Sequence, residues 1–116
     1  MIQLTPSSKI LLGIDPIDFR KGIDGICKTV KTDFELDPMV GTVFVFINRK
    51  GTQIRLLTYD GSGFWLCTKR LSKGVFWWPK SEDEKLSQVD AKKMLMVLWG
   101  ANPEKAPVYS DWRKVS

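Results

Sequence analysis

The middle of this chain alternates short apolar runs with turn-forming residues, and this pattern limits it to β-structure. The run Val-Phe-Val-Phe-Ile at residues 43–47 is β-branched and aromatic throughout, as is typical of a buried strand. Similar runs follow, separated by turns that contain glycine, and the last run stops at Pro79. The predicted strands are residues 43–47, 53–59, 64–70 and 75–78. Short turns between successive strands favour an antiparallel meander.

The regions on either side of this meander predict one further strand and a helix near each end. Residues 9–14 form a short apolar run that ends at a turn. Residues 19–34 carry apolar side chains at helical spacing, with Asp18 as the expected N-cap. A second amphipathic helix is expected over residues 89–99, after a capping box at residues 87–90 and before a terminating Gly100.

We therefore expect an α+β fold in which residues 1–100 form a single domain. Its central antiparallel meander sheet has about four strands plus the N-terminal strand. The tail, residues 101–116, contains two prolines and is expected to dock loosely or to be flexible. No apolar run approaches the ~20 residues that span a bilayer. The first residues lack the basic region and apolar stretch of a secretory signal, which predicts a cytoplasmic protein.

The composition argues against catalysis. Histidine is absent, which removes the commonest general base and the commonest metal ligand. The two cysteines, Cys27 and Cys67, lie in apolar settings outside any CxxC pair, which indicates reduced, buried thiols. The glycine-rich loops that cradle phosphates are also missing. We expect neither an enzyme nor a bound cofactor.

Carboxylates are the remaining candidates for metal ligands. Those nearest to structural boundaries are Asp15, Asp18, Asp24 and Asp60. Helix capping and turn formation explain all four, so we expect no metal site. A small metal-dependent nuclease that uses Asp24 or Asp60 is the catalytic alternative.

The positive charge is concentrated in the predicted meander. The net charge is +5, and basic and acidic residues balance outside the segment from Arg49 to Gly74. Within this segment Asp60 is the single acid. The basic residues of the segment are Arg49, Lys50, Arg55, Lys69, Arg70 and Lys73. Such local basicity favours a polyanionic partner, although a solvated surface that aids solubility would have the same composition.

Strand alternation suggests how aromatic side chains could join these cations. Arg55 and Tyr59 point to one face of their strand, and Trp65 and Lys69 share a face of the next strand. We expect one face of the sheet to carry all four, so that cations lie beside flat rings, as single-stranded nucleic acid requires. Tyr59 and Trp65 are then the stacking or partner contacts. The alternative is that the tryptophans fill the core between sheet and helices.

Residues 18–26, Asp-Phe-Arg-Lys-Gly-Ile-Asp-Gly-Ile, resemble a motif of one family of transposon-encoded proteins. This family is the TnpB-type, or second-open-reading-frame, protein of the insertion-sequence-sixty-six group of bacterial transposons. Further blocks keep the family's order from about residue 9 to residue 100. These blocks are residues 44–49, 54–64, 69–79 and 95–100. The sequence departs from the family at Ser72, where an acid is common, and in the tail beyond Gly100.

The resemblance implies a non-catalytic accessory protein that acts in transposition alongside a separate, larger transposase. It supplies no catalytic residues. Our first hypothesis is DNA binding through the six basic residues. The second is a protein–protein adaptor that recruits or regulates the transposase or another transposon-encoded protein. Candidate aromatic anchors for such an adaptor are Trp65, Trp77, Trp99 and Trp112.

Overall fold

A computed structural model describes residues 4–108 of the chain. Three strands lie where the apolar runs predict them. These are β2 (Val43–Ile47), β3 (Gln53–Tyr59) and β4 (Phe64–Arg70). They pair antiparallel in chain order, so this part of the meander is confirmed. All five residues of β2 are buried, because β2 lies in the middle of the sheet and is covered on both faces.

The sheet is mixed, which corrects the expectation of a purely antiparallel meander. The N-terminal strand β1 (Ile10–Gly13) pairs parallel with β2. A strand that was not predicted, β5 (Leu86–Val89), pairs antiparallel with β1 at the far edge. The five strands therefore lie in the order β4-β3-β2-β1-β5. The α+β class is confirmed, with the sheet extended on the β1 side.

Residues 75–78 do not form the predicted fourth strand. The backbone N–H of Phe76 instead donates to the oxygen of Gly51 at 2.8 Å, and the Phe76 side chain is buried in the core. The indole N–H of Trp78 donates to the oxygen of Gly13 at 2.8 Å. This segment therefore packs its aromatic side chains against the sheet without adding to it.

Both helices are present, and their starts differ from the predictions. The first, α1 (Ile23–Thr32), begins after Gly22, and no side chain caps it. The expected N-cap Asp18 accepts hydrogen bonds from Arg20 instead. The second, α2 (Ala91–Leu98), is capped by Asp90, whose carboxylate accepts from the N–H of Lys93 at 2.7 Å.

The predicted capping box over residues 87–90 is wrong, because Ser87 belongs to β5 and only Asp90 caps the helix. Gly100 follows α2 with a φ of +86°, a left-handed conformation that ends helices and favours glycine. Residues 103–108 then form the short 3₁₀ helix η1 (Pro103–Val108). The rest of the predicted tail, which includes Trp112, lies outside the described residues.

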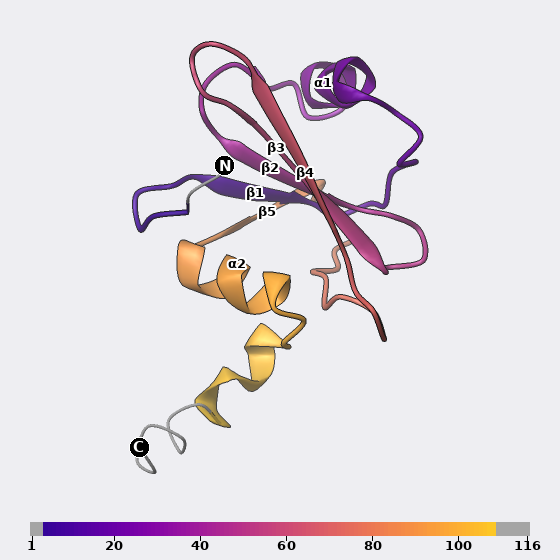
Figure 1. Cartoon of the computed structure of the whole chain (residues 1–116), viewed down its shortest axis with the longest axis vertical. Helices are drawn as coiled ribbons and strands as arrows, with labels where there is room; N and C mark the ends of the chain where they lie inside the picture. The colour runs from indigo at the N-terminus through magenta and orange to yellow at the C-terminus, as the bar shows by residue number, and fades with distance from the viewer. Residues whose placement is uncertain (1–3, 109–116) are drawn as a thin grey trace.

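The two helices cover opposite faces of the sheet (Figure 1). One core lies on the α1 face, where Ile26 and Val30 meet Phe44, Phe46 and Leu57. The other lies on the α2 face. Its larger members are Ile10, Leu12, Val45, Ile54, Phe76, Met94 and Val97. Successive residues of each central strand contribute to the two cores in turn, as alternation requires. Within the described range, the helices are too short or too polar to cross a membrane.

Candidate nucleic-acid interface

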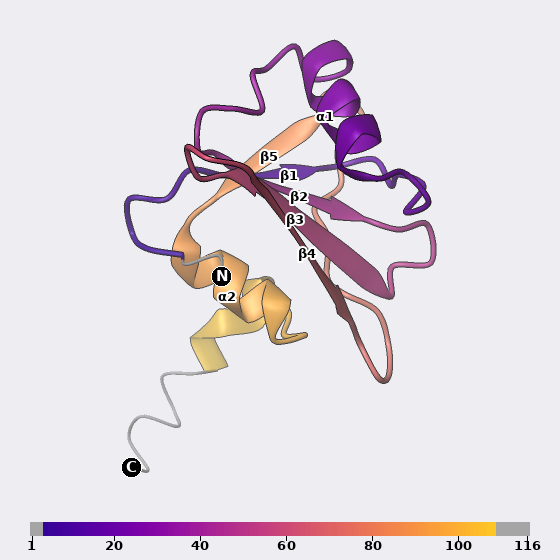
Figure 2. The same ribbon diagram turned by 45° about the horizontal axis from the view of Figure 1, so that its top comes forward.

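Strand direction brings three loops to one end of the sheet. β1 and β2 run parallel, and β3 is antiparallel to both β2 and β4. β1, β2 and β4 therefore all finish at the same end, which we call the C-terminal end of the sheet. The segments that follow them are residues 14–22, 48–52 and 71–76, and Figure 2 shows all three on the right of the view.

Backbone hydrogen bonds join these three segments. The N–H of Ile17 donates to the oxygen of Ile47 at 3.0 Å, which ties the first segment to the end of β2. The N–H of Leu71 donates to the oxygen of Thr52 at 3.0 Å. Together with the bond from Phe76 to Gly51, this joins the third segment to the second. The backbones of the three segments are therefore joined at one end of the sheet, although the segments are far apart in the sequence.

Four of the six predicted basic residues lie at this end. Arg49 and Lys50 are exposed in the turn between β2 and β3, and Lys73 is exposed in the loop after β4. Arg70, the last residue of β4, is exposed opposite Gln53. Among residues 4–105 the single ion pair joins Asp18 and Arg20. None of the four cations is therefore neutralised by a carboxylate of this part of the chain.

Arg55 has a different environment from these four. It is half-buried on β3. Its Nε donates to Thr68 Oγ1 and its Nη1 to the main-chain oxygen of Lys21, both at 3.1 Å. The guanidinium carbon also lies 4.6 Å from the centre of the Phe19 ring. Arg55 thus links the sheet to the segment before α1, and its guanidinium is largely occupied by the protein itself.

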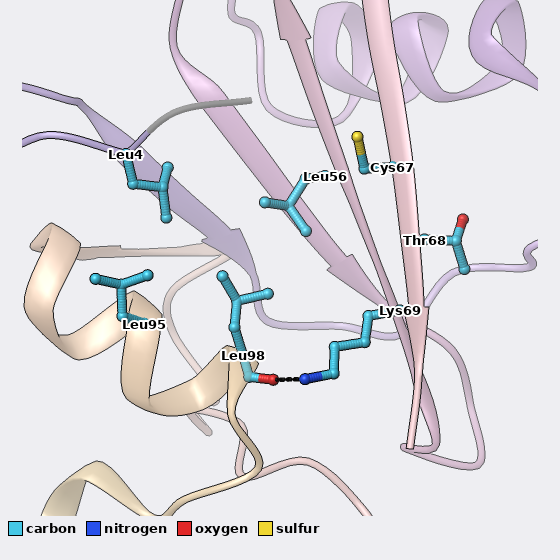
Figure 3. Close-up of a pocket in the computed structure, with 7 residues that line it drawn as sticks. All are labelled: Leu4, Leu56, Cys67, Thr68, Lys69, Leu95 and Leu98. Carbon is cyan, nitrogen blue, oxygen red and sulfur yellow. Dashed lines mark hydrogen bonds between the residues drawn. The ribbon is translucent and has the colours of Figure 1, made fainter. Parts of the chain in front are cut away.

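Lys69 is likewise engaged within the protein. Its Nζ donates to the main-chain oxygen of Leu98 at the end of α2 (Figure 3), and lies 5.6 Å from the centre of the Trp99 ring. The last carbonyl groups of a helix carry partial negative charge and lack partners within the helix. Lys69 therefore joins β4 to the C-terminus of α2.

The predicted common face of cations and aromatic rings is wrong. Arg55 pairs with Thr68, whereas Lys69 pairs with Ile54. Directly opposed residues of an antiparallel pair share a face, so Arg55 faces α1 and Lys69 faces α2. Tyr59 and Trp65 also lie on opposite faces. Tyr59 is paired with Phe64, whereas Trp65 is paired with Thr58, the neighbour of Tyr59 on β3.

The hairpin turn explains this error. The N–H of Asp60 donates to the oxygen of Gly63 at 3.0 Å, which closes a turn at residues 60–63. In this register odd-numbered residues of β3 oppose even-numbered residues of β4. Alternation within each strand was predicted correctly, but the turn decides how the faces of two strands combine.

Tyr59 and Trp65 also lie at the opposite end of β3 and β4 from Arg49 and Lys73. The Tyr59 hydroxyl donates to the oxygen of Gly61 at 3.1 Å, and its ring packs 5.0 Å from that of Phe64. The Trp65 indole N–H donates to the Asp60 carboxylate at 2.8 Å, and the residue is 43% exposed. The structure therefore does not bring these two rings together with the exposed cations.

Sequence reasoning missed two cations at the C-terminal end, Arg20 and Lys21. The Arg20 side chain is 91% exposed while it pairs with Asp18 at 2.7 Å. Hydrogen bonds from Arg20 lower the pKa of Asp18 to about 2, and the charge of Arg49 contributes to this shift. Arg49 is thus near enough to this pair to act on it. Both residues lie in the motif at residues 18–26, outside the basic segment from Arg49 to Gly74.

Acidic residues at the same end of the sheet lie at its opposite edge, next to β5. Residues 82–84 (Glu-Asp-Glu) precede β5, and the N–H of Ile14 donates to the oxygen of Lys85 at 2.9 Å. β5 is the edge strand farthest from β4. The end of the sheet is therefore acidic towards β5 and basic towards β4.

The four candidate carboxylates do not gather. Of the residues that the structure describes, no three or more His, Cys, Asp or Glu side chains form a group that could hold a metal ion. Asp60 instead accepts hydrogen bonds from the backbone N–H groups of Ser62 and Gly63. These bonds, with the one from Trp65, lower its pKa.

Comparison with known proteins identifies the class of protein to which this arrangement belongs. The family described as IS66 Orf2 like protein matches residues 8–107. The chain belongs to this family, as the motif at residues 18–26 predicted, and is an accessory protein of transposition.

Two relatives come from Sinorhizobium fredii. The uncharacterized protein y4jC is 33% identical over 97 residues, which cover 84% of this chain and 83% of the relative. The uncharacterized protein y4hO is 38% identical over 82 residues, or 71% of each chain. No solved structure matches the chain significantly.

Proposed function

We propose that this protein is a non-catalytic accessory factor of transposition that binds DNA through cations at the C-terminal end of the sheet. The observation that supports this proposal is the common direction of β1, β2 and β4, which delivers three cation-bearing segments to one place. The proposed phosphate contacts are Arg20, Lys21, Arg49, Lys50, Arg70 and Lys73.

This set differs from the one that the sequence suggested. Arg55 and Lys69 leave it, because each already donates to a main-chain oxygen and lies on an aromatic ring. Arg20 enters it, because its segment is bonded to the end of β2 and its side chain is 91% exposed even while it pairs with Asp18. Lys21 enters it, because the residue is exposed and, within residues 4–108, its Nζ donates only to the Thr29 hydroxyl, at 3.2 Å. The proposed contacts are mostly in turns, where long side chains can reach successive phosphates. Such contacts provide affinity for the DNA backbone rather than for a base sequence.

Charge reversal with a matched control tests the proposal. Fluorescence anisotropy with a labelled duplex compares the wild type, the double variant Arg49→Glu/Lys73→Glu and the control Lys28→Glu/Lys92→Glu. The control changes the net charge equally at exposed positions on the two helices. We expect the first variant to lose at least about tenfold in affinity at low salt and the control to lose much less. Equal losses, or no binding by the wild type, would refute the proposal.

A further inference from the structure

Among residues 4–108 no strand pairs with the outer edge of β4, which is seven residues long. Hydrogen bonds just before and just after β4 show which of its backbone groups are not bonded to β3. Gly63 accepts from Asp60, and Leu71 donates to Thr52. In an antiparallel pair bonded and non-bonded residues alternate. Odd-numbered residues of β4 therefore bond to β3, and the backbone groups of Phe64, Leu66, Thr68 and Arg70 point outward.

An apolar pocket adjoins this edge on the α2 face (Figure 3). It has a volume of about 320 Å³. Cys67 and Lys69 of β4 line one side, Leu95 and Leu98 of α2 the other, and Leu56 also lines it. Apolar side chains near it are unusually exposed: Leu95 is 55% exposed and Trp99 is 83% exposed. Exposed apolar side chains beside an unpaired strand edge favour association with another chain.

We propose that this edge is the interface of a symmetric dimer, in which the β4 strands of two copies pair antiparallel about Cys67. Cys67 is the midpoint of β4, so this register alone pairs the strand over its whole length. It also respects the direction of the free backbone groups, because Leu66 then exchanges hydrogen bonds with Thr68 of the second copy. Phe64 does the same with Arg70 of the second copy.

The side chains of β4 complement themselves in this register. The first half of the strand carries aromatic rings and the second half carries cations. Antiparallel pairing therefore places Trp65 opposite Lys69 of the second copy, and Phe64 opposite Arg70 of the second copy. No two like charges oppose each other. Lys69 keeps its bond to Leu98, so its aliphatic stem faces Trp65, whereas Arg70 brings a cation beside the Phe64 ring. β4 contains no acid, so a parallel or shifted pairing gains no ion pair within the strand.

The antiparallel dimer also brings an aromatic ring of the second copy to the pocket. Lys69 lines the pocket, and directly opposed side chains of paired strands lie about 5 Å apart at Cβ. Trp65 of the second copy therefore lies beside Lys69 at the edge of the pocket, with its indole N–H still bonded to Asp60 of its own chain. The dimer buries the exposed ring of Trp65, which the isolated chain leaves 43% exposed. This inference does not depend on DNA binding.

The oligomeric state of the full chain provides the first test. Sedimentation or light scattering compares the wild type with Thr68→Pro and with the control Gln88→Pro. Proline removes an outward N–H at an edge strand without breaking a backbone bond of the sheet. Thr68→Pro also removes the hydroxyl that accepts from Arg55, and Thr68→Val, which removes the hydroxyl alone, is the control for that loss and should stay dimeric. Gln88 is the matched position on β5. Ile14 and Lys85 are a bonded pair, and because bonded and non-bonded pairs alternate, the N–H of Gln88 points away from β1. We expect the wild type and Gln88→Pro to be dimers, and Thr68→Pro to have half their mass. A monomeric wild type, or a folded Thr68→Pro that stays dimeric, overturns the proposal.

Cross-linking tests the register even if Thr68→Pro does not fold. The chain has two cysteines, so the variant Cys27→Ser leaves Cys67 as its sole thiol. In the proposed dimer the two Cys67 residues form a non-bonded antiparallel pair, whose spacing a disulfide can bridge. Diamide, which oxidises two thiols to a disulfide and is itself reduced, should convert Cys27→Ser to covalent dimer. Cys67→Ser should give none. A dimer that fails to cross-link through Cys67 overturns the proposed pairing.

Discussion

The guanidinium of Arg55, on β3, donates a hydrogen bond of 3.1 Å to the main-chain oxygen of Lys21, which precedes α1. This contact joins residues 34 positions apart in the sequence. It also orients the segment that carries Arg20 and Lys21 along the sheet. A side chain that sequence alone would assign to phosphate binding therefore has a structural role, and the segment that it holds carries two of the proposed DNA contacts.

Replacement of Arg55 should therefore destabilise the fold. Arg55→Met keeps much of the aliphatic stem but loses two hydrogen bonds and the contact with Phe19. We expect the free energy of unfolding to fall by about 1–2 kcal/mol, the range for a partly exposed charged hydrogen bond. Urea denaturation followed by circular dichroism measures this loss. A variant as stable as the wild type would show that the link to Lys21 contributes nothing.

Lys69 and Lys73 provide a matched pair, because they are four residues apart and identical in charge. Lys69 is bonded to Leu98, whereas Lys73 is exposed in a loop. Lys69→Gln should lower the free energy of unfolding by about 1 kcal/mol and leave DNA affinity nearly unchanged. Lys73→Gln should leave the free energy of unfolding nearly unchanged and lower the DNA affinity. Thermal unfolding and anisotropy on both variants provide the comparison, and the same pattern in both would contradict this division of roles.

Salt dependence should report how many cations contact DNA. Each phosphate that the protein neutralises releases counterion, with a slope of log affinity against log salt of about −0.9 per contact on duplex DNA. Lys50→Ala and Lys73→Ala should each reduce the magnitude of the slope by about 0.9. The control Lys92→Ala should leave it unchanged. A wild-type affinity that is independent of salt would exclude phosphate contacts as the source of binding.

Acid should destabilise the protein through Asp18. Hydrogen bonds from Arg20 hold the pKa of this carboxyl at about 2, below the usual 3.8. Because the folded-state pKa is the lower one, ionised Asp18 stabilises the fold above pH 3.8, and the contribution is lost as the pH falls towards 2. Asp18→Asn should lower Tm at neutral pH and flatten its fall in this range.

The pKa of Asp60 is lowered further, chiefly by the N–H of Ser62, so its contribution should persist to more acidic pH. Tm measured across the acid range for wild type, Asp18→Asn and Asp60→Asn checks both statements. If the Asp18→Asn protein lost stability with acid as steeply as the wild type, the ion pair with Arg20 would have no part in acid unfolding.

Local signals predicted much of the fold. Gly-containing turns and apolar runs located β2, β3 and β4, and Gly100 marked the end of α2. The errors arose where a local pattern competes with tertiary packing. Residues 75–78 look like a strand, yet Phe76 and Trp78 are used to fill and close the α2 face. β5 was missed because its four residues have little strand character of their own and pair only with β1.

The sequence by itself determined the three central strands, the alternation of side chains along each, and the family, because these depend on neighbouring residues and on ordered motifs. Only the tertiary structure decided that β1 lies parallel to β2, that Arg55 and Lys69 face opposite helices, and that Arg20 lies at the same end of the sheet as Arg49. Such relations depend on the register of paired strands and on contacts between distant segments. The charge of a lysine can be read from the sequence, but whether that charge is available to a partner depends on the carbonyl groups that the fold brings to it.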